Sequence, residues 1–360
     1  MIEKLHQITE NGRTVVEIRS MDMEELTAFL TEQGYPKFRA KQMFEWMHEK
    51  RCRDFSEMSN LPAAMRSFLE ENCSPVSLKL LDRQISKLDG TQKFLFGLPS
   101  GNEQDLVESV FMPYRYGNSV CISSQVGCRM GCSFCASTLD GLIRNLAPSE
   151  MLEQIYEIER TTGEKISHVV VMGTGEPLDN YDNLVRFLRL LTMPGGMNLS
   201  QRNITVSTCG IVPGIRRLAE EDLSVTLALS LHAANDEKRK KIMPVAKRFS
   251  ISELMEACEY YFDRTGRRIT FEYSLIRGVN DSEQDAKELS ALAGRVHAHI
   301  NLIPVNPVPE TGYTQPAEQA VEAFKNRLEK QRINVSIRRV MGRDIDGACG
   351  QLRHRKISED

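Results

Sequence analysis

The chain lacks the features that would place it in a membrane or outside the cell. No run approaches ~18 apolar residues, the length that a helix needs to cross a bilayer, and residues 1–6 contain no apolar signal core. The nine cysteines are an odd number in a chain of 360 residues, which argues against a secreted disulfide framework. We therefore expect a cytoplasmic protein without a membrane segment.

Internal repeats and low-complexity segments are also missing, and Gly and Pro are few, at 23 and 14. This composition suits a globular protein with one large and one smaller domain. The net charge of −3 does not indicate a general polyanion binder. Charge alone leaves open whether the two basic clusters near the ends bind phosphates or are ordinary solvated faces: Lys37, Arg39, Lys41, Lys50, Arg51 and Arg53, and Arg332, Arg338, Arg339, Arg343, Arg353, Arg355 and Lys356.

Residues from about 20 to 73 have the apolar periodicity of a small helical module. The pattern changes to a period of two from about 76 to 113, which predicts strands over 93–98 and 105–112. On the second strand Glu108 shares a face with Leu106, Val110 and Met112. The pattern alone favours an edge strand that leaves this carboxylate in solvent.

From about residue 118 onward, short apolar strands alternate with amphipathic helices. The strands are predicted over 119–123, 168–172, 204–208, 225–231, 269–275 and 299–305. Six βα units indicate an α/β fold with a parallel sheet, either open and doubly wound or curved into a barrel. We expect a partial (β/α)6 barrel over 118–345, preceded by a helical accessory module (1–75) and a short β extension (76–117), and followed by a C-terminal segment (346–360).

The most informative motif is the C-x3-C-x2-C spacing of Cys128, Cys132 and Cys135, directly after the first barrel strand. Three thiolates hold a [4Fe–4S] cluster with one iron left open, whereas a ferredoxin closes all four positions. In this spacing the open iron usually binds S-adenosylmethionine (SAM), and Phe134 is placed to pack beside its adenine. A zinc knot or buried free thiols are the alternatives, but zinc prefers paired C-x2-C knuckles, and the sequence has no second one.

Polar residues follow the barrel strands where an apolar core needs none. Gly175 and Glu176 lie in Met-Gly-Thr-Gly-Glu-Pro after the second strand, and the later strands end in Ser207, Ser230-Leu231-His232 and Asn306. Singly, the serines suit helix caps and His232 a backbone contact. Together they meet at the carboxyl edge of the sheet, which predicts a SAM pocket there.

One further cysteine, Cys349, lies between small residues in Asp344-Ile-Asp-Gly-Ala-Cys-Gly-Gln-Leu352. A thiol in such a segment is accessible to a reactant, yet on this segment alone a buried structural cysteine is favoured. Cys121, on the strand before the cysteine loop, is equally ambiguous. The four other cysteines are interpreted as structural: Cys52, Cys73, Cys209 and Cys258.

Taken together, these motifs resemble the RlmN/Cfr radical-SAM RNA methyltransferases. The resemblance rests on the segments Ser-Ser-Gln-Val-Gly-Cys128, Met-Gly-Thr-Gly-Glu176-Pro, Ser-Leu-His232 and Ala-Cys349-Gly-Gln-Leu, and it extends over nearly the whole chain. It is closest to the dual-specificity RlmN branch, which methylates carbon 2 of adenine in 23S rRNA and in tRNA.

The resemblance implies a role for each residue. Cys128, Cys132 and Cys135 would ligate the cluster, and Cys349 would carry the methyl group. Cys121 would be its disulfide partner and Glu108 the acid/base group, which reverses the interpretations favoured by pattern alone. SAM would be bound by Gly175, Glu176, Ser207, Ser230, Leu231, His232 and Asn306.

The same resemblance implies two SAM molecules per turnover, an S-methylcysteine, a covalent RNA–protein adduct and an external electron donor such as flavodoxin or ferredoxin. A monomer is expected. The nearest alternative is carbon-8 methylation of the Cfr type, which the shared motifs do not separate. A radical-SAM enzyme acting on a small molecule has no use for the Cys349 segment, and an electron carrier needs a fourth cluster ligand.

Overall fold

The structure, a computed structural model, describes residues 7–10, 13–306, 309–339, 341–345 and 350–359. Its main element is a ten-stranded sheet with the strand order β15-β14-β13-β12-β11-β10-β7-β6-β5-β4. Its parallel part consists of β7 (Gly117–Ile122), β10 (Ile166–Val171), β11 (Ile204–Thr208), β12 (Thr226–Ser230), β13 (Thr270–Leu275), β14 (His299–Pro304) and β15 (Val335–Ile337).

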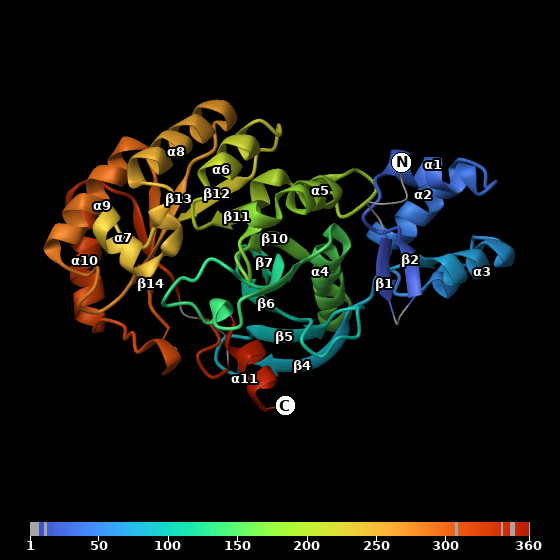
Figure 1. Cartoon of the computed structure of the whole chain (residues 1–360), viewed down its shortest axis with the longest axis horizontal. Coiled ribbons are helices and arrows are strands. Elements are labelled where there is room, and N and C mark those ends of the chain that lie inside the picture. Colours follow the sequence, from blue (N-terminus) through green and yellow to red (C-terminus); the bar gives the residue numbers. More distant parts are fainter. Residues whose placement is uncertain (1–6, 11–12, 307–308, 340, 346–349, 360) are drawn as a thin grey trace.

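These parallel strands form where the sequence has short apolar runs, because both faces of the sheet are covered. Their order in space follows their order in the chain without reversal, so successive crossovers wind in one direction and the sheet curves into a partial barrel. Figure 1 shows the helices on the outer face: α4 (Pro148–Thr162), α5 (Tyr181–Thr192), α6 (Val212–Ala219), α7 (Asp236–Ile242), α8 (Ile251–Thr265), α9 (Glu283–Arg295) and α10 (Glu318–Lys330).

The predicted partial barrel of six βα units is therefore confirmed, and the doubly wound alternative is wrong. The structure adds a seventh parallel strand, β15, which the sequence pattern missed. β15 has three residues, all of them only partly buried, so it lacks the apolar run that identifies its neighbours.

The β extension continues the barrel sheet rather than forming a separate unit. Strands β4 (Lys79–Ile85), β5 (Gln92–Gly97) and β6 (Leu106–Tyr114) are antiparallel, and β6 pairs with β7. The strands expected over 93–98 and 105–112 correspond to β5 and β6, whereas β4 was not predicted. Since β6 lies between β5 and β7, it is not an edge strand.

The N-terminal module packs at one end of the barrel (Figure 1). Its helical part is α1 (Met23–Glu32), α2 (Phe38–Phe44), the π-helical turn η2 (Glu45–Glu49) and α3 (Ala63–Asn72), and their apolar stripes are buried as expected. The module also contains strands that were not predicted, which form a small sheet: β1 (Gln7–Glu10), β2 (Arg13–Glu17) and β3 (Cys73–Ser74).

Helix α4 joins the module to the barrel through buried charges. Arg19 is fully buried; its guanidinium is paired with Glu153 of α4 and donates to the carbonyls of Val76 (3.0 Å) and Cys52 (2.5 Å). Nearby, Nδ1 of His48 lies 3.0 Å from the Tyr156 hydroxyl, and burial lowers the pKa of His48 to about 3. The interface is therefore a dry polar network in which each charge depends on its partner.

Replacing Arg19 by methionine is expected to destabilise this interface by about 3–5 kcal/mol, because it leaves Glu153 buried with one cation fewer. The chain has a single tryptophan, and Trp46 lies in the module, so its fluorescence during urea unfolding reports on this part of the molecule. In the control variant Arg264→Ala, which removes a solvent-exposed pair with Glu220, the unfolding midpoint should not move measurably. An unchanged midpoint in Arg19→Met would contradict the role of the network.

Candidate functional site

The cysteine loop begins where β7 ends and is braced by a two-stranded sheet, β8 (Gln125–Gly127) with β9 (Leu142–Asn145). Gly127 has φ +74°, and a Cβ there would lie 1.9 Å from the carbonyl oxygen of Gly141. Only glycine fits this close approach. The backbone N–H of Cys128 donates to the same carbonyl at 2.8 Å, which fixes where the first cysteine of the loop emerges.

The loop brings Cys128, Cys132 and Cys135 to the wall of one cavity of about 160 Å³. Burial raises the pKa of the Cys128 thiol to about 12 and raises that of Cys132 further. Thiols that are buried in this way become thiolates only next to a cation, which a metal supplies. Within the described residues, no group of three or more His, Cys, Asp or Glu side chains surrounds the position of a single metal ion.

This donor set fits an iron–sulfur cluster. Each thiolate of a [4Fe–4S] cluster binds a different iron, so a cluster requires thiols around a cavity rather than around one point. Three thiols from one short loop around a shared cavity meet this requirement, and the loop supplies no fourth. Cys128, Cys132 and Cys135 are therefore the residues that could hold the cluster.

The same cavity is lined by most of the residues predicted to bind SAM: Gly175, Glu176, Ser207, Ser230 and His232. Two predicted residues lie elsewhere. Leu231 is fully buried and does not line the cavity, and Asn306 is exposed and lines a second, larger cavity. The hydroxyls of Ser207 and Ser230 are 3.2 Å apart across the β11–β12 pair, so they hydrogen-bond to each other.

His232 is held rigidly at the end of β12. It has φ +53°, unusual for a residue with a side chain, and its Nδ1 accepts the Ser274 N–H at 2.9 Å. Burial lowers the pKa of His232 to about 3, so the ring is neutral and carries its proton on Nε2. The Phe134 ring stands edge-on against it, with 4.9 Å between centroids.

Glu176 is buried, and its carboxylate accepts the backbone N–H groups of Cys209 (2.6 Å) and Leu178 (3.1 Å). Burial is the main cause that raises its pKa. Its glycine neighbours serve packing: a Cβ at Gly175 would lie 2.7 Å from Cβ of Gln125. The Gly-x-Gly turn thus seats the end of β10 against the start of the cysteine loop.

Cys209, which the sequence suggested was simply structural, also lines the cluster cavity. Its thiol is hydrogen-bonded to Glu176, and burial with this carboxylate nearby raises the pKa of Cys209 well above its ordinary value. Nothing in the spacing Thr-Cys209-Gly indicates this position, because the residue is far from the C-x3-C-x2-C loop in sequence.

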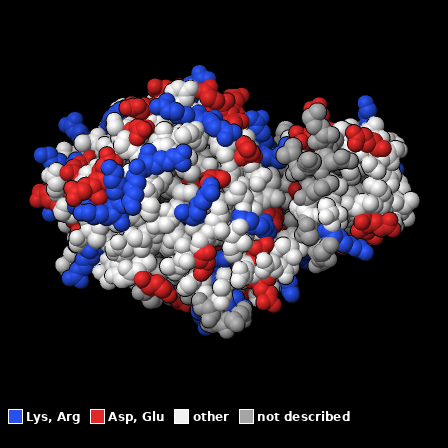
Figure 2. All heavy atoms as spheres, in the orientation of Figure 1, with Lys and Arg blue, Asp and Glu red and all other residues white. Residues whose placement is uncertain are grey.

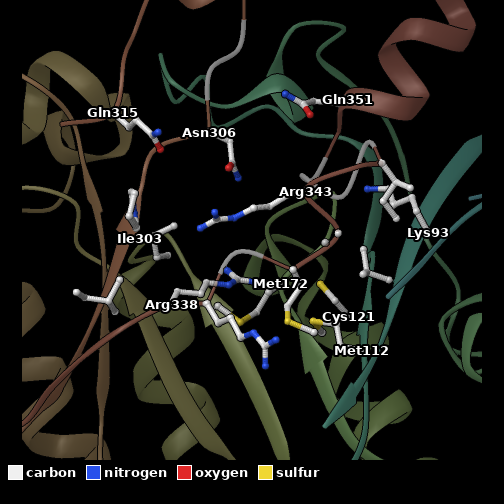
Figure 3. A pocket seen from close by; sticks show the side chains of 18 of the residues that line it. Lys93, Met112, Cys121, Met172, Ile303, Asn306, Gln315, Arg338, Arg343 and Gln351 are labelled. Atoms are coloured by element: carbon white, nitrogen blue, oxygen red, sulfur yellow. The ribbon is translucent and has the colours of Figure 1, made fainter. Parts of the chain in front are cut away.

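A larger cavity of about 770 Å³ adjoins the first, and Met172 and Gly173 line both. Figure 3 shows Met112, Cys121 and Met172 close together, with the Arg343 side chain reaching across the cavity toward Ile303. Cys121 is only 7% exposed on strand β7. No disulfide joins any two of the eight cysteines that the structure describes.

Glu108 also lines this cavity, and the solvent-exposed position favoured by the sequence pattern is wrong. Its carboxylate is 2% exposed and lies 2.7 Å from Nζ of Lys93, which is buried on β5. Lys93 was not predicted as a site residue. It lies on the same face of β5 as Leu95, and these two residues pair with Val110 and Glu108, so the period of two along both strands could have indicated it. Cys349 lies outside the described residues, but its neighbour Gly350 donates its N–H to Glu108 at 2.7 Å.

In the structure, some residues of the two basic clusters form ion pairs within the protein, whereas others line the larger cavity. Arg51 and Arg53 pair with Glu159 and Glu157 of α4, and Arg353 is buried against Asp140. These arginines are structural. The cations that line the larger cavity are Arg338, Arg339 and Arg343, besides Lys93. On the face shown in Figure 2, basic and acidic side chains lie in small mixed groups.

Comparison with known proteins gives the same picture. Two family models match: Radical SAM superfamily over residues 122–289, and Ribosomal RNA large subunit methyltransferase N-terminal domain over residues 16–74. A protein of Lachnospira eligens named "Probable dual-specificity RNA methyltransferase RlmN" is 58% identical over 96% of this chain and 98% of its own length. A protein of the same name from Clostridium perfringens is 49% identical over 94% and 97%.

The chain belongs to the RlmN family of radical-SAM RNA methyltransferases. Its fold agrees with that of a solved relative, a radical SAM methyltransferase from Sphaerobacter thermophilus, with a TM-score of 0.89 and 40% identity over 93% of this chain and 98% of the other. The resemblance inferred from the motifs is thereby confirmed. Among the described residues, no helix is long and apolar enough to span a bilayer.

Proposed function

We propose that this RlmN-family chain methylates carbon 2 of an adenine in 23S rRNA and in tRNA, with Cys349 as the methyl carrier. One observation carries the proposal: the backbone directly after Cys349 is bound to buried Glu108, at a cavity that also contains Cys121. The residues proposed as base and resolving thiol line one cavity, and the proposed carrier directly precedes Gly350 in the chain. This cavity adjoins the one lined by the three cluster cysteines. The near full-length likeness to dual-specificity RlmN proteins supports the choice of substrates.

A cluster held by Cys128, Cys132 and Cys135 would supply, with bound SAM, one-electron cleavage of SAM and hence a carbon radical. Glu176 and His232 line that cavity as buried polar groups. With its proton on Nε2, His232 is a neutral hydrogen-bond donor, and Gly175, Ser207 and Ser230 form the remaining wall. Asn306 would contact the part of the ligand that reaches the larger cavity, and Leu231 would act only through its backbone.

The protein residues divide the reaction between two thiols and one carboxylate. Carbon 2 of adenine is electrophilic and does not accept a methyl cation, so Cys349 would first take a methyl group from one SAM, and the second SAM would be cleaved. The carbon radical from that cleavage would take a hydrogen atom from the S-methyl group, and the methylene radical left on Cys349 would add to carbon 2 and link RNA to protein. The adduct radical would then pass one electron to an oxidised iron–sulfur or flavin carrier. Glu108 would accept the ring proton, and Cys121 would attack the Cys349 sulfur, forming a disulfide as the methylated RNA is released.

Each turnover then ends with an oxidised thiol pair, so an external donor such as flavodoxin or ferredoxin would restore both the thiols and the cluster. The two thiols must approach to disulfide distance, with Cα atoms roughly 4.4–6.8 Å apart. Cys121 is fixed on a central strand, so the movement belongs to the C-terminal segment.

The adenine must leave its base stack to reach this cavity, since a ring carbon inside a helix is inaccessible. A cavity of about 770 Å³ is large enough for one nucleotide. Arg338, Arg339 and Arg343 line it without an ion pair to any carboxylate of the described residues. They are therefore available to hold the phosphates on either side of the extruded base.

Replacing these arginines should weaken RNA binding in a salt-dependent way. For each phosphate contact that Arg338→Gln or Arg343→Gln removes, the slope of log K against log[salt] should fall by about 0.7. Charge reversal at half-buried Arg39 and exposed Lys41 on the N-terminal module should also reduce affinity and slope. The matched control is Arg332→Gln, an exposed arginine that does not line the cavity. Unchanged slopes in all variants would refute phosphate binding at both places.

The carbon-2 assignment is tested with RNA whose target adenine carries deuterium at carbon 2. Carbon-2 methylation must expel that deuterium, so the product should contain a methyl group and no deuterium at this position. Mass spectrometry of the digested RNA distinguishes the alternative, carbon-8 methylation of the Cfr type, in which the deuterium stays. Methylated product that retains the label would exclude our assignment.

A further inference from the structure

Lys93 and Glu108 form an ion pair that is almost completely removed from water. Their side chains are 1% and 2% exposed, and Nζ lies 2.7 Å from Oε2. A carboxylate in such a position keeps its charge only with a close cation and further hydrogen-bond donors. The reaction proposed above assigns Glu108 a proton but gives Lys93 no role.

Glu108 has two more donors, and both belong to the start of helix α11 (Gln351–Glu359). Its Oε2 accepts the Gly350 N–H at 2.7 Å, and its Oε1 accepts the Arg353 N–H at 2.5 Å. The first N–H groups of a helix have no partner within the helix. A carboxylate satisfies them and is favoured by the helix dipole, so Glu108 caps α11 from a strand 242 residues away in sequence.

The other side of this cap is closed by the cysteine loop. Gly350 has φ +81°, and a Cβ there would lie 2.8 Å from both N and Oγ of Ser137, two residues after Cys135. Leu352 packs into a small apolar cluster with Leu95 and Leu106. The chain next to Cys349 is thus seated between Glu108 and the cysteine loop.

The strand register relates Lys93 to the second thiol. Lys93 pairs with Val110 across β5 and β6, and Val110 pairs with Cys121 across β6 and β7. Directly opposed residues share a face of the sheet, so Lys93 and Cys121 stand in one row on the cavity side. Figure 3 shows Lys93, Gln351 and Cys121 around the same cavity.

We propose that Lys93 is a positioning residue of this reaction: it keeps Glu108 charged and thereby seats the segment that carries Cys349. This role rests on the proposed function. When Glu108 takes the ring proton, the C–H electron pair stays in the adenine and the proton neutralises a carboxylate oxygen. The cap then loses the charge that held Gly350 and Arg353, so proton transfer loosens the segment just when Cys121 must reach Cys349.

Backbone hydrogen exchange tests the seating without RNA or SAM, on the full-length protein holding its cluster. In Lys93→Met, peptides covering 350–359 should exchange at least about tenfold faster than in the unaltered protein, whereas peptides of α4 should not change. Lys93→Arg retains a cation and should restore most of the protection. Glu108→Gln, which imitates the protonated acid, should give the same fast exchange as Lys93→Met.

The double variant Lys93→Met/Glu108→Gln separates positioning from general destabilisation. If Lys93 acts through Glu108, the double variant should exchange no faster than Glu108→Gln alone. The double variant removes both charges, at positions 93 and 108. If Lys93→Met fails to fold and the double variant folds, the cause is the Glu108 carboxylate left buried without its cation. Additive acceleration, or faster exchange throughout the barrel, would overturn the proposal.

RNA binding distinguishes Lys93 from the cavity arginines. Because its charge is matched by Glu108, Lys93→Met should leave the salt slope of RNA affinity unchanged, and a slope lower by about 0.7 would mean that Lys93 binds a phosphate instead.

If the unaltered protein makes no methylated RNA, the proposed function fails. If it does, and the 350–359 peptides exchange equally in all variants, only the role of Lys93 fails.

Discussion

The Cys121→Ala variant is expected to accumulate RNA covalently joined to protein. Without the second thiol the bond between the carrier and the ring is not resolved, so each chain should stop after one turnover with most of the active enzyme in adduct. Cys121 is 7% exposed on β7, and alanine fits a strand position of this size, so the barrel should remain intact. Denaturing electrophoresis with labelled RNA detects the adduct, and mass spectrometry of the digest locates it on Cys349.

Two further variants complete this experiment. Cys349→Ala has no carrier and should form neither adduct nor methylated RNA. Cys73→Ala, a buried cysteine of the N-terminal module that lines neither cavity, should behave like the unaltered enzyme. Free methylated RNA at normal yield from Cys121→Ala or Cys349→Ala would refute the two-thiol scheme.

Removing one cluster cysteine is expected to have an equally large effect. Cys132→Ala leaves two thiols, too few to retain the cluster, so iron should fall from roughly four atoms per chain to near background. Formation of 5′-deoxyadenosine from SAM should fall with it, because the cluster supplies the electron for that cleavage. Iron analysis and chromatography of the reaction mixture, both under anaerobic conditions, measure the two quantities.

Cys209→Ala is the matched control for this loss. Cys209 is buried in the wall of the same cavity as Cys132. It does not belong to the cysteine loop, and its thiol is hydrogen-bonded to Glu176. Its removal should leave iron content and SAM cleavage close to normal. If Cys209→Ala loses the cluster, this residue is a fourth ligand and the three-cysteine site is wrong.

The strands of the barrel could be predicted because a covered parallel sheet requires apolar runs. Segment 204–208 corresponds to β11 residue for residue. The spacing of apolar residues did not predict the positions at which polar side chains are buried. The sequence shows one apolar stripe on α4, yet two of its polar residues are also fully buried: Glu153 against Arg19 of the N-terminal module, and Gln154 against Ser109 and Ser123. Partners so distant in sequence leave no local pattern.

In the site, too, some residues could be predicted from the sequence and others could not. The spacing of the cysteine loop and the strand-end residues were visible in sequence, because they depend on local chain order. Lys93 and Cys209 were missed, since each gains its significance from a partner that is distant in sequence. Pattern alone placed Glu108 in solvent, as it does not show that β6 has a neighbour on both sides. The resemblance to the family corrected that position.

The proposed reaction requires a cluster in which one iron has no protein ligand. Mössbauer spectroscopy of the anaerobically reconstituted, ⁵⁷Fe-labelled enzyme, recorded with and without SAM, tests it most directly. We predict that one of roughly four iron sites changes its signal when SAM is added while the others stay unchanged. Four equivalent sites that do not respond to SAM, or zinc in place of iron, would contradict the account.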